Sequence, residues 1–126
     1  MQKRILWIAF ALILFSGCKK DNTTNNNSSR TLRYEITGNY SGSLVASYTT
    51  ATGGTANETV TTLPWAKEIT YASSVTAADI AIAGNGGTVG QQVTVIVKRG
   101  GTQVSSTTTT ADNAGSLSRS APVIVF

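Results

Sequence analysis

In the stretch Val93-Thr94-Val95-Ile96-Val97-Lys98, valine occupies every second position, and this pattern decides the fold class. Side chains that alternate over four to eight residues indicate a β-strand with one buried face. The same period of two recurs from Leu32 to Thr37 and from Leu44 to Thr49. Shorter versions follow at residues 69–71 and 80–82. Valine and threonine, which favour pleated surfaces, supply much of the pattern.

Turn residues separate these runs, at 51–55, 84–87, 99–101 and 112–115. Glycine and asparagine tolerate the positive φ angles of tight hairpins. No stretch after the first eighteen residues shows helical spacing of apolar side chains. The sequence therefore predicts an all-β domain, an antiparallel β-sandwich of about seven to eight strands over residues 31–126. The expected core residues are Leu32, Tyr34, Ile36, Tyr48, Val60, Trp65, Ile69, Ile82, Val93, Val95, Val97 and Val123.

The beginning of the chain is typical of a bacterial export signal. A basic start, Met1 to Arg4, precedes eleven unbroken apolar residues, Ile5 to Phe15. Eleven residues are too few to span a bilayer, but they suit the apolar part of a signal peptide. Phe15-Ser16-Gly17-Cys18 resembles the lipobox of bacterial lipoproteins, with Phe15 in place of the usual leucine. The resemblance implies a lipoprotein signal peptide over residues 1–17 and lipidation of Cys18; a plain secretory leader with a free thiol is the alternative.

Residues 18–30 are predicted to be the acylated cysteine and a flexible polar tether. Lys19 to Ser29 contains no apolar residue, so it cannot offset the entropy cost of ordering. A single acyl chain binds a membrane weakly, whereas the two or three chains of a lipidated cysteine anchor stably. Lys19 is not the aspartate linked to inner-membrane retention in enteric bacteria. We therefore expect a lipid-anchored protein of the cell envelope, in the outer membrane, on its periplasmic or surface side.

Composition excludes several kinds of chemistry. The chain of 126 residues has no histidine and one cysteine, which removes histidine-based catalysis, internal disulfides and multi-cysteine metal sites. Without the leader, the charge falls from +4 to +2, from eight basic and six acidic residues, and no basic face for nucleic acid is left. We predict no catalytic residue, no metal, no cofactor and no identified small-molecule substrate, so the protein is expected not to be an enzyme.

Four short motifs carry a resemblance to a known family. They are Leu32-Arg33-Tyr34-Glu35-Ile36-Thr37-Gly38, Ser47-Tyr48-Thr49 with Gly53-Gly54-Thr55, Leu63-Pro64-Trp65-Ala66-Lys67, and a valine strand entering Lys98-Arg99-Gly100-Gly101. Over residues 32–104, this order resembles the MmpS family of small exported proteins. The resemblance implies an immunoglobulin-like β-sandwich that assists a large lipid exporter. The chain departs from that family in having a lipobox instead of a membrane helix, and in lacking a cysteine pair near the domain's end.

Three aromatic residues are candidates for a ligand or partner surface: Trp65, Tyr40 and Tyr71. An exposed aromatic ring can stack on a sugar, and the competing interpretation is a ring that fills the core. The final stretch, residues 121–126, is apolar on both strand phases. It is predicted to be a doubly buried last strand, or an edge strand that pairs with another chain.

These observations predict a non-catalytic binding or accessory module that is held at a membrane by its lipid anchor. The expected partner is an envelope protein complex such as an exporter. The alternative is a structural or adhesive surface subunit that acts through strand exchange or glycan binding.

Overall fold

The computed structural model describes residues 28–126. The predicted signal peptide, Cys18 and most of the predicted tether lie outside the described residues. Residues 28–126 contain ten strands: β1 (Thr31–Gly38), β2 (Ser43–Thr49), β3 (Thr55–Val60), β4 (Trp65–Thr70), β5 (Ala77–Ala78), β6 (Ile80–Asn85), β7 (Gln92–Arg99), β8 (Thr102–Thr110), β9 (Leu117–Ser120) and β10 (Ile124–Val125).

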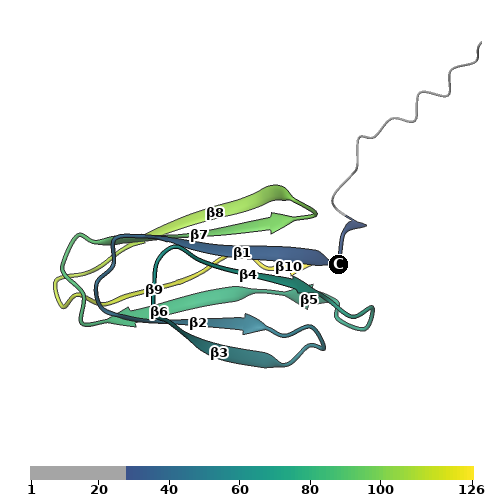
Figure 1. The fold of residues 1–126 in the computed structure, drawn as a ribbon, viewed down its shortest axis with the longest axis horizontal. Coiled ribbons are helices and arrows are strands. Elements are labelled where there is room, and N and C mark those ends of the chain that lie inside the picture. The colour runs from purple at the N-terminus through teal and green to yellow at the C-terminus, as the bar shows by residue number, and fades with distance from the viewer. Residues whose placement is uncertain (1–27) are drawn as a thin grey trace, which may run out of the picture.

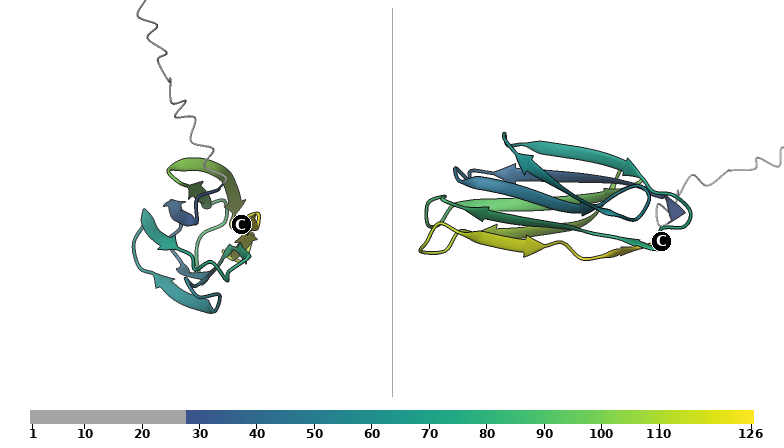
Figure 2. Two further views of the ribbon diagram at one scale, coloured as in Figure 1. Left: turned by 90° about the vertical axis from the view of Figure 1, so that its right-hand side faces the viewer. Right: turned by 90° about the horizontal axis from the view of Figure 1, so that it is seen from below.

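Eight of the strands form two antiparallel sheets that lie face to face (Figures 1 and 2). Sheet A has the order β4-β1-β7-β8, and sheet B has the order β3-β2-β6-β9. The prediction of an all-β sandwich is confirmed. β5 and β10 pair in a small third sheet and have two residues each, too few for alternation to mark them in the sequence. The immunoglobulin-like assignment stays a prediction.

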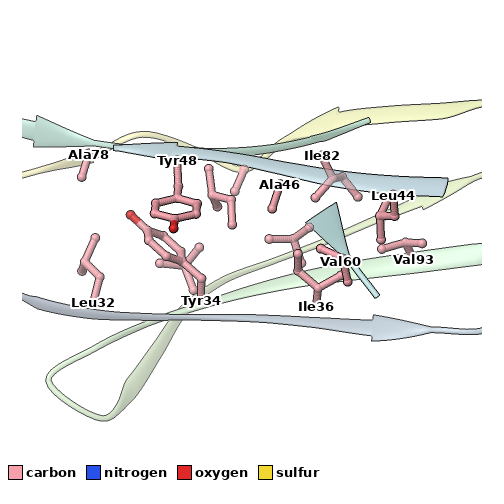
Figure 3. Close-up of a cluster of buried hydrophobic side chains, with 14 of the residues drawn as sticks. Leu32, Tyr34, Ile36, Leu44, Ala46, Tyr48, Val60, Ala78, Ile82 and Val93 are labelled. Carbon is pink, nitrogen blue, oxygen red and sulfur yellow. The ribbon is translucent and has the colours of Figure 1, made fainter. Parts of the chain in front are cut away.

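The core lies between the two sheets, where every second side chain points inward (Figure 3). On β7, for example, Val93, Val95 and Val97 are buried, while the residues between them are half-buried. Nine of the twelve predicted core residues are buried: Leu32, Tyr34, Ile36, Tyr48, Val60, Ile82, Val93, Val95 and Val97. Eight of the nine lie in the period-two runs of the sequence, because alternation is the geometry of the strand itself; Val60 lies outside those runs.

Three predicted core residues are not fully buried, and each lies at the margin of a sheet. Trp65 and Ile69 are half-buried because they belong to β4, one of the two edge strands of sheet A, which has a neighbouring strand on one side only. Val123 is 57% exposed. It precedes the short strand β10, which pairs with β5 outside the two main sheets.

The prediction of a doubly buried last strand is wrong. β10 has only two residues, and Val125 is 69% exposed. The chain end is held by Phe126 instead. Its ring lies 5.2 Å from the ring of Tyr71, and the guanidinium groups of Arg30 and Arg99 lie 4.5 and 5.1 Å from its centre. Two cations against one aromatic ring fix the terminus by cation–π attraction.

The sandwich is elongated and has two distinct ends (Figure 1). At one end, the tether pole, the described chain enters at Ser29 and Arg30 and finishes at Phe126. Arg99 closes this pole by donating to the carbonyl oxygens of Ser29 (2.7 Å) and Val125 (3.2 Å). The opposite end, the distal pole, is formed by the loops 39–42, 61–64, 86–91 and 111–116.

Candidate functional site

A pocket of about 430 Å³ opens at the distal pole. Its walls are the β1–β2 loop with the end of β1 (residues 38–42) and the β3–β4 loop (residues 61–63). Leu44 and Val60 also line it, from the start of β2 and the end of β3. The peptide bond between Leu63 and Pro64, beside the second wall, is cis. The pocket is thus built from loops carried on rigid strands, the usual place for a binding site.

The β1–β2 wall is held in place by Tyr40. The Tyr40 ring is buried and lies against Gly84 and Gly87, where an added Cβ would come within 2.6 and 2.2 Å of ring atoms. Its hydroxyl donates to the carbonyl oxygen of Gly115 at 2.6 Å. Tyr40 therefore fixes one wall of the pocket from beneath, and its ring is not exposed as a surface for stacking.

Two further residues tie the same loop to the β6–β7 connection. The backbone N–H and hydroxyl of Ser41 both donate to Oε1 of Gln91, at 3.0 and 3.1 Å. Asn39 accepts from the backbone N–H of Gln92 through Oδ1 at 2.8 Å, so it retains the two N–H donors of its amide. These bonds preorganise the wall before any ligand arrives.

The chemistry of the pocket is neutral and amphipathic. None of its ten lining residues is charged. Leu44, Val60 and Leu63 give an apolar part, whereas the exposed Thr61 and Thr62 offer hydroxyl groups. An uncharged molecule that presents both C–H and O–H groups suits such a lining, since no charge has to be desolvated.

A second cluster of functional groups lies along one side of the sandwich, where the edge strands β3 and β4 approach each other. This edge cluster consists of Tyr48, Glu58, Trp65 and Lys67. The Lys67 ammonium donates to Oε2 of Glu58 at 2.6 Å and to the hydroxyl of Tyr48 at 2.9 Å. The Tyr48 hydroxyl donates to the same carboxylate oxygen at 2.9 Å, and the indole N–H of Trp65 reaches Oε1 at 3.3 Å.

The edge cluster closes the gap between the two sheets. Hydrogen bonds from Lys67 and then Tyr48 hold the pKa of Glu58 below its usual value. The same contacts, with Glu58 first and Tyr48 second, raise the pKa of Lys67. Both groups are therefore charged at neutral pH. The four side chains hydrogen-bond to one another across the edge between β3 and β4. The arrangement is therefore structural, and these polar contacts take the place of apolar packing at this edge.

Trp65 accordingly matches neither of the two interpretations made from the sequence. Its ring is half-buried and packs against Tyr48, with 6.3 Å between ring centres. Its N–H is bonded to a carboxylate, not to the backbone carbonyl that a core position would supply. Part of the ring still faces solvent, so of the three predicted surface residues Trp65 alone keeps an accessible face.

Tyr71 is buried, with 3% of its surface exposed. Its hydroxyl donates to the carbonyl oxygen of Thr49 at 2.8 Å and lies 2.8 Å from the hydroxyl of Tyr34. Burial raises the pKa of both tyrosines. The interpretation of Tyr40 and Tyr71 as ligand platforms is thus corrected. Beside a turn, the sequence does not show whether an aromatic side chain points toward the core or toward solvent. Only the packing of the folded chain decides which ring turns inward.

The carboxylates with perturbed pKa values are perturbed in the direction opposite to that of a general acid. Arg33 and Lys98 hydrogen-bond to Glu35 at 2.9 and 3.0 Å and lower its pKa. Glu35 lies on sheet A and Glu58 on sheet B. A glycosidase acid needs a raised pKa and a facing partner. Among residues 28–126, no group of three or more His, Cys, Asp or Glu side chains could hold a metal ion.

Sequence reasoning did not find the pocket or the edge cluster. A signal was present for the second: Glu58 and Lys67 have opposite charges, and each occupies the inward phase of its strand. Recognising it requires the pairing of β3 and β4 with their neighbours, which fixes both side chains at one edge.

Within the part of the chain that the structure describes, no helix has the length and apolar character needed to cross a bilayer. No protein-family model and no curated protein sequence matches this chain.

Proposed function

We propose that this chain is a lipid-anchored, non-catalytic binding module of a bacterial cell envelope, serving there as an accessory to an envelope protein complex. The observation that carries the proposal is the separation of the two poles. The chain enters at Ser29 and finishes at Phe126 on the tether pole, whereas the pocket opens on the distal pole. An anchor on Cys18 would hold the tether pole toward the membrane and turn the pocket away from it.

Dimensions support this arrangement. β1 connects the poles through eight residues, which rise about 25 Å at roughly 3.3 Å per residue. The eleven residues Lys19 to Ser29 add up to about 35–40 Å when extended. The pocket would thus stand several tens of ångströms from the lipid surface, within reach of a partner in the same membrane. The resemblance to the MmpS family makes an exporter the first partner to test. Lys19, which stands where an inner-membrane retention aspartate would be, makes the outer membrane the first compartment to test.

Cys18→Ala is expected to release the protein from membranes or to stall its processing. Without the thiol no acyl chain can be attached, and each buried methylene of such a chain contributes about 0.8 kcal/mol of membrane binding. The measurement is membrane fractionation of cells that produce the full chain, with mass spectrometry of the mature N-terminus. Thr23→Ala, in the same tether, is the matched control and should stay anchored. A Cys18→Ala protein held as firmly as the parent would refute the anchor.

A second candidate function, binding of a neutral saccharide, is favoured by the pocket lining. Saccharides combine hydroxyl groups with apolar C–H faces, which matches Asn39, Thr61 and Thr62 beside Leu44, Val60 and Leu63. Charged glycans suit it less, since none of the lining residues can pair with a charge. The same site could serve an accessory module that handles envelope polysaccharide.

Thr62→Glu is expected to weaken binding of a neutral oligosaccharide by about tenfold or more, because the ligand must then desolvate an unpaired carboxylate. A panel of neutral and acidic oligosaccharides is first screened for binding to the full chain in detergent micelles. The affinity of each oligosaccharide that binds is then measured by calorimetric titration. Thr59→Glu, on the solvent-facing phase of β3, adds the same charge outside the pocket and should leave affinity unchanged. Equal losses of affinity in the two variants, or a panel in which no oligosaccharide binds, would contradict the saccharide function. Neither result would bear on the proposal of a lipid-anchored module.

A further inference from the structure

The end of β6 and the turn after it contain Asn85-Gly86, the only asparagine–glycine pair in the sequence. An asparagine side chain can react with the backbone nitrogen of the next residue, because the attack on Cγ closes a five-membered ring. A side chain on that next residue hinders the attack, and glycine has none. Asn85 is therefore the asparagine of this chain that its sequence neighbour leaves most open to such a reaction.

The structure leaves the pair accessible. Asn85 is exposed at the end of β6, and Gly86 is exposed in the turn that follows, at the distal pole (Figure 1). Gly86 has φ +76°, and an added Cβ would meet nothing within 4 Å. Within residues 28–126, the N–H of Gly86 makes no hydrogen bond to another backbone group. Asn85 pairs with Ser43 at the last position of the β2–β6 ladder, and the end of a ladder opens most easily.

We propose that Asn85 is a site of spontaneous covalent modification, at which asparagine becomes isoaspartate through a succinimide formed with Gly86. In the first step, the Gly86 nitrogen gives up its proton and bonds to Cγ of Asn85, while the bond from Cγ to Nδ2 breaks and ammonia leaves. In the second step, water opens the ring at one of its two carbonyl carbons. Opening at the backbone carbonyl carbon gives isoaspartate, and opening at Cγ gives aspartate. The balance is asparagine and water in, one of these two products and ammonia out.

One wall of the distal pocket lies directly against this peptide bond. Gly42 lines the pocket, and a Cβ added to it would lie 2.4 Å from the carbonyl oxygen of Asn85 and 2.8 Å from the carbonyl carbon of Gly86. In isoaspartate the backbone runs through Cβ and Cγ, which lengthens it by one methylene group. Because the two backbones are already in close contact, the added length has to displace Gly42 and the wall it belongs to.

Gly87 connects the turn to the same wall. An added Cβ on Gly87 would lie 2.2 Å from the ring of Tyr40, and its N–H donates to the carbonyl oxygen of Gly115 at 3.0 Å. A shift of the turn would therefore also reach Tyr40, which supports the wall from beneath. The converted protein is expected to be less stable than the parent and to have an altered pocket.

The test incubates the full chain in detergent micelles at neutral pH and physiological temperature for several weeks, followed by trypsin digestion and mass spectrometry. Cleavage after Lys67 and Lys98 releases residues 68–98, in which Asn85 is the only asparagine. This peptide is expected to gain the mass difference between an OH and an NH₂ group, and its fragments should place the change at position 85. Labelling by an isoaspartate methyltransferase should identify the main product.

The same digest contains an internal control. Residues 100–119 carry Asn113, which is exposed but is followed by Ala114, and this peptide should keep its mass. The chain unfolded in urea serves as the standard of reactivity. If Asn85 stays intact in the folded chain while it converts in the unfolded one, the turn protects it and the proposal is overturned. Equal conversion of Asn113 and Asn85 in the folded chain would overturn it as well.

The effect on the wall is measured on the converted protein, which its added negative charge separates by ion exchange. Its urea midpoint should be lower than that of Asn85→Asp, which carries the charge on a backbone of normal length. Equal midpoints would refute the displacement of the wall. Asn85→Ser, which cannot form the ring, should keep its midpoint throughout the incubation. Affinity for a saccharide should fall with the converted fraction; only this last readout rests on the proposed saccharide function, so its failure leaves the modification itself to the mass measurement.

Discussion

Gly115→Ala is expected to lower the free energy of unfolding by roughly 2–4 kcal/mol, although it adds only a single methyl group. Gly115 has φ +74°, in the left-handed region that alanine adopts only with strain. An added Cβ would also lie 2.0 Å from the backbone oxygen of Gly87. A backbone oxygen cannot rotate away as a side chain can, so the β8–β9 loop has to move.

That movement would reach the pocket. The carbonyl oxygen of Gly115 accepts hydrogen bonds from the Tyr40 hydroxyl (2.6 Å) and from the Gly87 N–H (3.0 Å). Both bonds are lost if the loop shifts, and Tyr40 supports the β1–β2 wall. Saccharide affinity, where it is found, should therefore fall together with stability.

Urea denaturation of Gly115→Ala and Gly101→Ala measures the effect and separates its two causes. Gly101 has a similar φ of +85°, but an added Cβ would meet nothing within 4 Å. Gly101→Ala should consequently cost only the strain of a left-handed alanine, about 1–2 kcal/mol. Equal losses at the two positions would mean that the close approach of Gly87 contributes nothing.

Tyr71→Phe is expected to destabilise the domain by about 2–3 kcal/mol although it removes a single oxygen atom. Tyr71 donates to the carbonyl oxygen of Thr49, so its own oxygen accepts the proton of the Tyr34 hydroxyl. Without Tyr71 Oη, the buried Tyr34 hydroxyl and the Thr49 carbonyl both lose their partner. An unsatisfied buried polar group is more costly than the net value of the bond it made.

Tyr34→Phe provides the comparison. This substitution removes the Tyr34 hydroxyl, which donates to Tyr71, but leaves the hydrogen bond from Tyr71 to Thr49 intact. A loss of only about 1 kcal/mol is therefore expected. Thermal and urea denaturation at neutral pH, where both hydroxyls are protonated, gives the two values. A Tyr71→Phe protein as stable as the parent would contradict the buried role and return Tyr71 to the candidates for a surface ligand site.

The fate of the three aromatic candidates shows where sequence reasoning stops. The three residues flank turns or begin a strand: Tyr40, Trp65 and Tyr71. At such positions the alternation of apolar and polar residues does not show whether a side chain points inward or outward. Tyr40 turns inward because two glycines make room for its ring. Tyr71 turns inward because Tyr34 and Thr49, distant in sequence, provide its hydrogen bonds. Trp65 is half-buried because β4 happens to be an edge. None of these partners is adjacent in the chain.

What the sequence by itself determined is local and periodic: the strands, the inward phase of Leu32, Tyr34, Ile36 and the β7 valines, and hence a two-layered β domain. Side chains of a strand alternate between its faces wherever the strand lies, so this information survives without knowledge of neighbours. Tertiary structure alone decided which strands became edges, which pole carries the pocket, and which polar groups meet. Those outcomes depend on pairing between strands that are distant in the sequence. Only once the order of strands in each sheet is set does Glu58 contact Lys67, and only then is β8 an edge strand.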